Sequence, residues 1–141
     1  TSDNDGNAAT QKSVTFIIDT VPPTLNITTP NDGIKTNKTS ITVSGKTNDV
    51  TSSPVTLTVK LNSGNAEAVT VNNDGSFSKD LTLADGANTI TITAKDSAGK
   101  TTTIVRNVTL DTHAPAFSNI VITPNPVNVG VGFTVSVTIT D

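Results

Sequence analysis

Apolar and polar residues alternate along much of the chain, the period-two pattern of half-buried β-strands. The clearest case is the segment Val55–Leu61, in which every second residue is Val or Leu and the residues between them are Thr or Lys. The segment Thr89–Ala94 repeats the pattern with Ile and Ala alternating with Thr. No window shows a sustained apolar period of 3.6 residues. The pattern therefore predicts an all-β chain with essentially no helix.

Turn signals divide these alternating segments. Asn73–Gly75, Asp85–Gly86 and Asp96–Gly99 combine Asn, Asp or Ser with Gly, residue types that accept the backbone angles of tight turns. Between residues 21 and 111 we expect about seven strands, at the spacing typical of a β-sandwich. The residues expected to form its core are Val55, Leu57, Val59, Phe77, Leu81, Ile90, Ile92 and Val108.

One segment occurs twice. Asp19–Pro23 matches Asp111–Pro115 about 92 residues later (111 minus 19), a spacing within the size of one small domain. The match continues in Ile41–Ser44 and Phe133–Ser136. We therefore expect a segment of a tandem array with three parts: residues 1–20 as the final strand of a preceding module, 21–111 as a complete module, and 112–141 as the first strands of a following module.

Composition supports strands and argues against several partners. Threonine is the most abundant residue, and Trp, Tyr, Met and Cys are absent, which favours strands and excludes disulfides. The net charge is −3, and the nine Lys and Arg residues are scattered, so nucleic acid is not an expected partner. No apolar run approaches the roughly 18 residues of a membrane span, so we expect no membrane insertion by this segment.

Several spaced motifs resemble bacterial immunoglobulin-like repeats, particularly the type related to domain B of glucodextranase. The motifs are Asp19–Leu25, Val43–Gly45, Val71–Phe77, Leu83–Ile90 and Ala94–Gly99. The resemblance covers Asp19 to Asp111 fully and both flanks partly. It implies an immunoglobulin-like β-sandwich in a secreted or surface-anchored bacterial or archaeal protein. Such modules serve as spacers, stalks, adhesive domains and appendages of extracellular enzymes, so the resemblance implies a fold more specifically than a function.

No catalytic constellation is visible in the sequence. His113 is the only histidine and lies beside proline in a predicted linker, so a Ser-His-Asp triad would have to form at a domain junction. Glu67 is the only glutamate, and the spacing suggests no aspartate partner for two-carboxylate glycosidase chemistry. The sequence has no Gly-rich phosphate loop, and its four phenylalanines lie in strand patterns that suggest core rather than a sugar-stacking surface. We therefore do not expect an enzyme.

Aspartates lie at the predicted turns and module junctions. Asp3, Asp19, Asp96 and Asp111 could supply carboxylate oxygens to a hard cation, with calcium as the candidate cofactor, where strand ends meet. The run from Asp3 to Asn7 resembles a calcium loop superficially. It lacks the aspartate at the first position of such a loop and the glutamate at the twelfth, where Lys12 stands. The alternative is turn chemistry, in which Asp side chains hydrogen-bond their own backbone. Both interpretations stay open at this point.

Two charged residues, Lys79 and Arg106, fall on the phase that should face the core. Bulges or edge-strand positions would let their charged groups reach water, and the alternative is a buried charge with a partner. An isopeptide bond from Lys79 to an asparagine, known in related surface domains, would require a buried carboxylate beside the pair. The single glutamate and the sparse aromatic residues argue against that bond.

The leading functional hypothesis is a non-catalytic structural or spacer module of an elongated bacterial cell-surface protein, of the adhesin-stalk type, located outside the cell. Its expected partners are neighbouring modules of the same chain and a host-surface or lattice protein. One alternative is a surface-layer or fibre subunit that assembles by strand exchange. Another alternative is an accessory domain of an extracellular polysaccharide-degrading enzyme.

Overall fold

The computed structural model describes residues 12–16, 18–49, 52–123, 130, 132 and 134–140. Every regular element in these ranges is a β-strand, which confirms the predicted all-β class. No helix capable of spanning a membrane occurs among the described residues.

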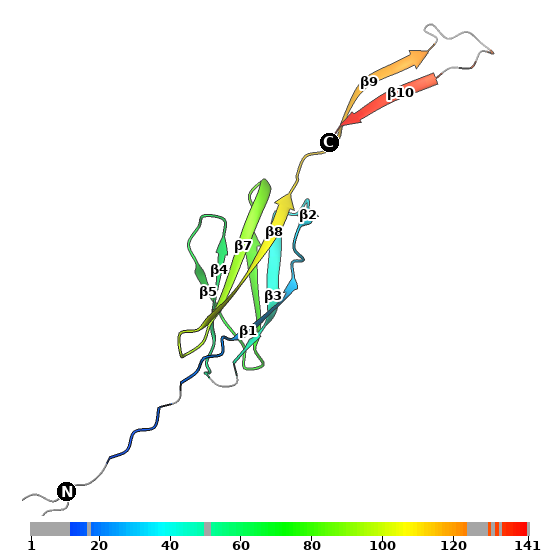
Figure 1. The fold of residues 1–141 in the computed structure, drawn as a ribbon. Helices are drawn as coiled ribbons and strands as arrows, with labels where there is room; N and C mark the ends of the chain where they lie inside the picture. Colours follow the sequence, from blue (N-terminus) through cyan, green and yellow to red (C-terminus); the bar gives the residue numbers. More distant parts are fainter. Residues whose placement is uncertain are drawn as a thin grey trace, which may run out of the picture.

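Residues 24–49 and 52–110 form two sheets that pack face to face (Figure 1). The smaller sheet has the order β1-β3-β6, and the larger sheet has the order β2-β8-β7-β4-β5. Neighbouring strands are antiparallel except β2 and β8, which are parallel. This is an immunoglobulin-like sandwich. Its strands are β1 Thr24–Thr29, β2 Ile34–Thr36, β3 Ser40–Asn48, β4 Thr56–Leu61, β5 Glu67–Val69, β6 Ser76–Thr82, β7 Gly86–Lys95 and β8 Thr101–Leu110.

The core lies between the sheets and is built from the alternating apolar positions. Of the residues predicted to form it, only Val55 is partly rather than fully buried, at the edge of the cluster. Strand β2 was not among the expected strands, because its three residues are too few to show an alternating pattern. The buried members of the predicted core are Leu57, Val59, Phe77, Leu81, Ile90, Ile92 and Val108.

The chain enters the sandwich at one end and leaves it at the other (Figure 1). The hydroxyl of Thr102 donates a hydrogen bond of 2.6 Å to the carbonyl of Pro23, so the start of β1 lies beside the start of β8. Strand β8 then runs to Leu110 at the far end. We call the end near Pro23 the entering end and the end near Leu110 the leaving end.

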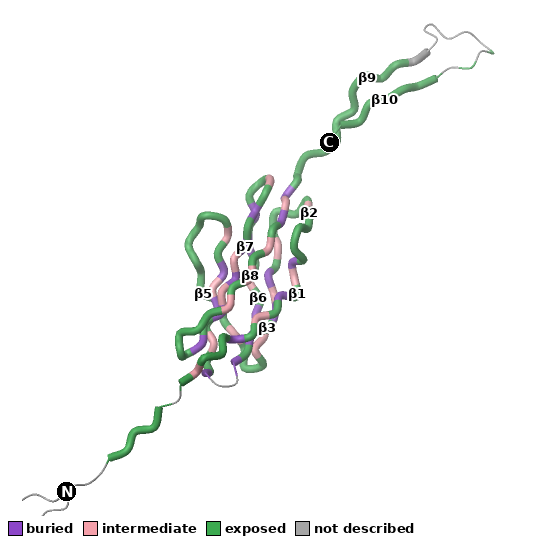
Figure 2. Tube along the Cα trace, viewed as in Figure 1, coloured by how far each residue is buried: buried purple, intermediate pink, exposed green. Residues whose placement is uncertain are grey.

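The described residues of both flanks are largely exposed. Strands β9 (Ala116–Thr123) and β10 (Thr134–Thr140) form a separate antiparallel pair, and the apolar residues described in them are largely solvent-accessible (Figure 2). In the preceding flank, residues 12–16 and 18–20 are assigned to no strand. The assignment of 1–20 and 112–141 to adjacent modules stays a prediction.

Lys79 and Arg106 lie at sheet edges, as one of the two interpretations predicted. Strand β6 is the edge of the smaller sheet, and the Nζ of Lys79 lies 2.7 Å from the Oε2 of Glu67 on β5, the edge of the larger sheet. Arg106 precedes the part of β8 that pairs with β2, and its Nε donates to the carbonyl of Pro30 at 3.2 Å. Both side chains are half-buried and have polar partners.

Candidate functional site

Three aspartates from separate parts of the chain meet at the entering end. Asp19 precedes β1, Asp49 follows β3 and Asp96 follows β7. One carboxylate oxygen of each lies within 4.8 Å of the corresponding oxygens of the other two. Asp49 and Asp96 are only 6% and 4% exposed, and Asp19 is half-buried. We call these three residues the aspartate cluster.

Each member of the cluster also organises a turn. The Oδ1 of Asp96 accepts a hydrogen bond from the backbone N–H of Lys100 at 2.8 Å, within the turn that joins β7 to β8. The Oδ1 of Asp49 accepts one from Ser52 at 2.9 Å. The Oδ1 of Asp19 accepts one from the backbone N–H two residues later, also at 2.9 Å. The predicted turn chemistry is therefore present, and it occupies one oxygen of each carboxylate.

The second oxygen of Asp96 is in a different situation. Its Oδ2 is fully buried, and no hydrogen-bond donor reaches it among the described residues. The backbone N–H of Ser97 donates to the carbonyl of Ser52 at 3.1 Å, which ties the turn of Asp96 to the loop of Asp49. Burying a carboxylate oxygen without a donor or a cation is costly, which sets this oxygen apart from the turn-forming ones.

The cluster contains two of the four aspartates predicted as metal ligands, Asp19 and Asp96. Asp111 is not brought to it, because β7 and β8 are antiparallel and Asp111 follows the last residue of β8, at the leaving end. There its Oδ1 accepts a hydrogen bond of 3.0 Å from the backbone N–H of His113. Asp3 lies outside the described residues.

Asp49 was missed as a candidate, although the sequence carries a signal for it. Strand β3 buries every second residue, Val43, Gly45 and Thr47, and the next position on this buried phase is Asp49. A carboxylate that continues an apolar face must find a partner at the strand end. That pattern distinguishes Asp49 from the aspartates that lie in exposed turns.

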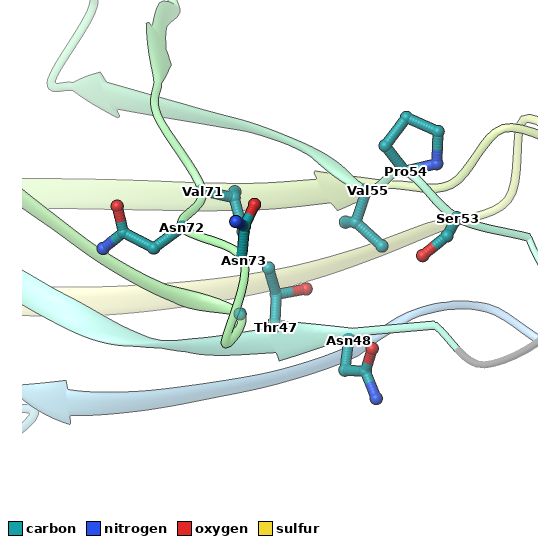
Figure 3. A pocket seen from close by; sticks show the side chains of 9 residues that line it. Thr47, Asn48, Ser53, Pro54, Val55, Val71, Asn72 and Asn73 are labelled. Carbon is teal, nitrogen blue, oxygen red and sulfur yellow. The ribbon is translucent and has the colours of Figure 1, made fainter.

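A shallow pocket of about 420 Å³ lies beside the C-terminal end of β3 (Figure 3). Its lining carries no titratable side chain and no aromatic ring, so it offers neither acid–base chemistry nor a surface for stacking a sugar ring. The residues that line it are Thr47, Asn48, Ser53, Pro54, Val55, Val71, Asn72, Asn73 and Gly75.

Comparison with known proteins identifies a family for most of this chain. Residues 23–112 match the family described as glucodextranase, domain B. Bacillopeptidase F of Bacillus subtilis (strain 168) is 31% identical over 120 residues, which cover 85% of this chain and 8% of that protein. This chain therefore spans only a small part of that relative's length.

Solved structures with a similar backbone share little sequence. An engineered protein has a TM-score of 0.50 at 19% identity, covering 63% of this chain and 20% of that one. The fibronectin(III)-like modules of CbhA from Clostridium thermocellum have a TM-score of 0.49 at 14% identity, covering 64% of this chain and 47% of that one. The likeness to the engineered protein supports the sandwich fold alone.

Proposed function

The chain belongs to the glucodextranase domain B family, and on that premise we propose that it is a non-catalytic structural module that spaces other parts of an elongated bacterial protein outside the cell. The observation that carries this proposal is the path of the chain, which enters the sandwich at one end and leaves it at the other (Figure 1). A module of this shape adds its full length to the protein that contains it.

The pairing of β2 with β8 suits such a module to bear tension. The two strands are parallel, and β2 continues from the entering strand β1 while β8 leads to the leaving end. The backbone N–H of Gly33 donates to the carbonyl of Asn107 at 2.8 Å, and that of Asp111 donates to Thr36 at 2.9 Å. Tension along the chain slides these strands past each other, so several hydrogen bonds must break together rather than one after another.

The only histidine of the chain lies in the segment that leaves the sandwich. His113 is exposed, and its Nδ1 lies 3.6 Å from the Oδ1 of Asp111 and 3.9 Å from the Oδ2 of Asp85. The neighbours of this imidazole are carboxylates, whereas a Ser-His-Asp triad would need a serine hydroxyl beside it.

A second candidate function is an accessory domain of an extracellular enzyme. The family description names a glucodextranase, and the relative in Bacillus subtilis is named as a peptidase. Both functions use the same spacing property and differ in what lies beyond the module. A catalytic domain in the full-length protein would favour the enzyme accessory, and further sandwich repeats would favour the stalk.

Single-molecule stretching tests the spacer directly. The chain has no cysteine, so the variant Ser97→Cys gives a single thiol for attachment, in the turn at the entering end. We expect a clearly higher unfolding force when the chain is pulled through its two ends than when it is pulled between its N-terminal end and position 97, which peels β1 from the edge of its sheet. Equal forces in the two geometries would contradict a load-bearing role.

A further inference from the structure

We propose that Asp19, Asp49 and Asp96 bind a divalent cation of the hard, oxygen-preferring kind, with calcium as the best fit. The site would join the segment that enters the sandwich to the ends of β3 and β7. This inference rests on the geometry of the aspartate cluster and does not depend on the proposed spacer function.

The separation of the carboxylates matches a shared cation. Calcium binds oxygen ligands at about 2.3–2.6 Å, so two oxygens on the same ion lie no more than about 5 Å apart. One oxygen from each of the three aspartates lies within 4.8 Å of the others. Three negative groups at this distance repel one another strongly where water is scarce, and a cation between them turns that repulsion into attraction.

Burial supplies an independent argument. Asp96 is 4% exposed, and its Oδ2 is a buried acceptor that receives no hydrogen bond from the described residues. The lysine ion pairs among the described residues involve other carboxylates, since Lys46 pairs with Asp74 and Lys79 with Glu67. A metal ion would provide the positive partner that this oxygen lacks.

The ligand chemistry selects the class of ion. All three side chains are carboxylates, without the histidine or cysteine that zinc and copper sites favour. Carboxylates suit calcium, magnesium and manganese, and a site assembled from three separate loops suits the flexible coordination of calcium better than the strict octahedron of magnesium. Backbone carbonyls and water would complete the coordination shell.

Asp19 gives the site a mechanical consequence. It lies outside the strands of the sandwich, on the segment that leads into β1, whereas Asp49 and Asp96 are held at strand ends. A bound cation would therefore restrain the entering segment against the sandwich. Removal of the ion would release that segment without removing any residue of the core.

The experiment is a calcium titration of the 141-residue chain by isothermal calorimetry, paired with thermal unfolding in calcium and in excess chelator. We expect one site per chain and a higher Tm in calcium, because a ligand that binds only the folded state stabilises it. Magnesium serves as the second probe and should bind at least tenfold more weakly.

Three variants locate the site. Asp96→Asn keeps an acceptor for the N–H of Lys100 and removes the charge, and Asp19→Asn changes a residue outside the sandwich, so this variant should fold in any case. Each should weaken calcium binding at least tenfold and reduce the rise in Tm. The matched control Asp111→Asn alters the same kind of turn at the leaving end and should bind calcium as the unaltered chain does.

Two results would overturn the proposal. One is a chain that releases no binding heat and melts identically in calcium and chelator. The other is an Asp19→Asn chain that binds calcium as tightly as the unaltered chain, which would place the ion elsewhere.

Discussion

The Oδ1 of Asp32 accepts a hydrogen bond of 2.7 Å from the backbone N–H of Asn107, which lies 75 residues further along the chain. The side-chain amide of Asn107 donates to the same oxygen at 3.2 Å. Asp32 belongs to the loop that carries the chain from β1 to β2, and Asn107 belongs to β8. This contact therefore joins the loop between β1 and β2 to strand β8.

This relationship predicts a loss of stability in acid. The backbone hydrogen bond from Asn107 is the main cause that lowers the pKa of Asp32 below its usual value of 3.8, and the nearby Arg106 charge acts in the same direction. Because the folded pKa is the lower one, the stabilisation is fully present above the unfolded pKa and is lost as the pH falls through the folded value. Urea unfolding measured between pH 6 and about pH 2.5 should show this decline.

The variant Asp32→Asn should flatten that decline, because an amide does not titrate in this range. The pKa of Asp74 is lowered too, chiefly by the hydroxyl of Ser76, so Asp74→Asn should remove a separate part of the pH dependence. The two sites lie in different loops, and their effects should add in the double variant. A pH profile unchanged by either substitution would refute the assignment.

Buried Asn88 should be among the least replaceable polar residues. Its Nδ2 donates to the carbonyls of Ala84 and Gly86 at 2.7 and 3.0 Å, and its Oδ1 accepts from the N–H of Ala84 at 3.0 Å. The variant Asn88→Ala leaves these backbone groups without a partner and should lower the free energy of unfolding by about 2–4 kcal/mol. Asn72→Ala, at an exposed amide, should cost less than about 1 kcal/mol in the same urea titration. Equal costs would contradict the role of this network.

Gly75 should reject a side chain for two separable reasons. Its φ of +80° disfavours any L-residue, and a Cβ there would clash with the carbonyl oxygen of Thr47. Gly99 has a φ of +89° with nothing within 4 Å of the corresponding position, so Gly99→Ala measures the backbone strain alone, about 1–2 kcal/mol. Thermal or urea unfolding should show a distinctly larger loss for Gly75→Ala. A difference near zero would mean that β3 moves aside without cost.

The ion pair that links the two sheet edges should contribute little. Lys79 and Glu67 approach to 2.7 Å, but their side chains are 31% and 62% exposed, and water screens such a pair. Glu67→Gln should change the free energy of unfolding by less than about 1 kcal/mol, and the change should shrink further in 1 M salt. The control Lys46→Gln, at a pair 3.9 Å apart and more exposed, should have a still smaller effect. A salt-independent loss of several kcal/mol would show that Lys79 is held as a buried charge.

Local pattern alone determined most of the strands and their inward faces, with the three-residue strand β2 as the exception. Because the side-chain period of a strand is two, the alternation in Val55–Leu61 and Thr89–Ala94 assigns each residue to a face without knowledge of its neighbours. The repeated segments Asp19–Pro23 and Asp111–Pro115 likewise indicated a local turn contact. Asp19 and Asp111 both accept a hydrogen bond from the backbone N–H two residues later, a contact that depends only on adjacent residues.

Only the tertiary structure decided which aspartates meet. Asp96 and Asp111 look alike in the sequence, yet the antiparallel pairing of β7 with β8 puts them at opposite ends of one hairpin. The same topology brings Asp49, from the end of β3, to the entering end beside Asp19 and Asp96. Strand order is set by contacts between residues far apart in the chain, and no local period records it. The longer strands could therefore be predicted from the sequence, whereas strand β2 and the aspartate cluster required the fold.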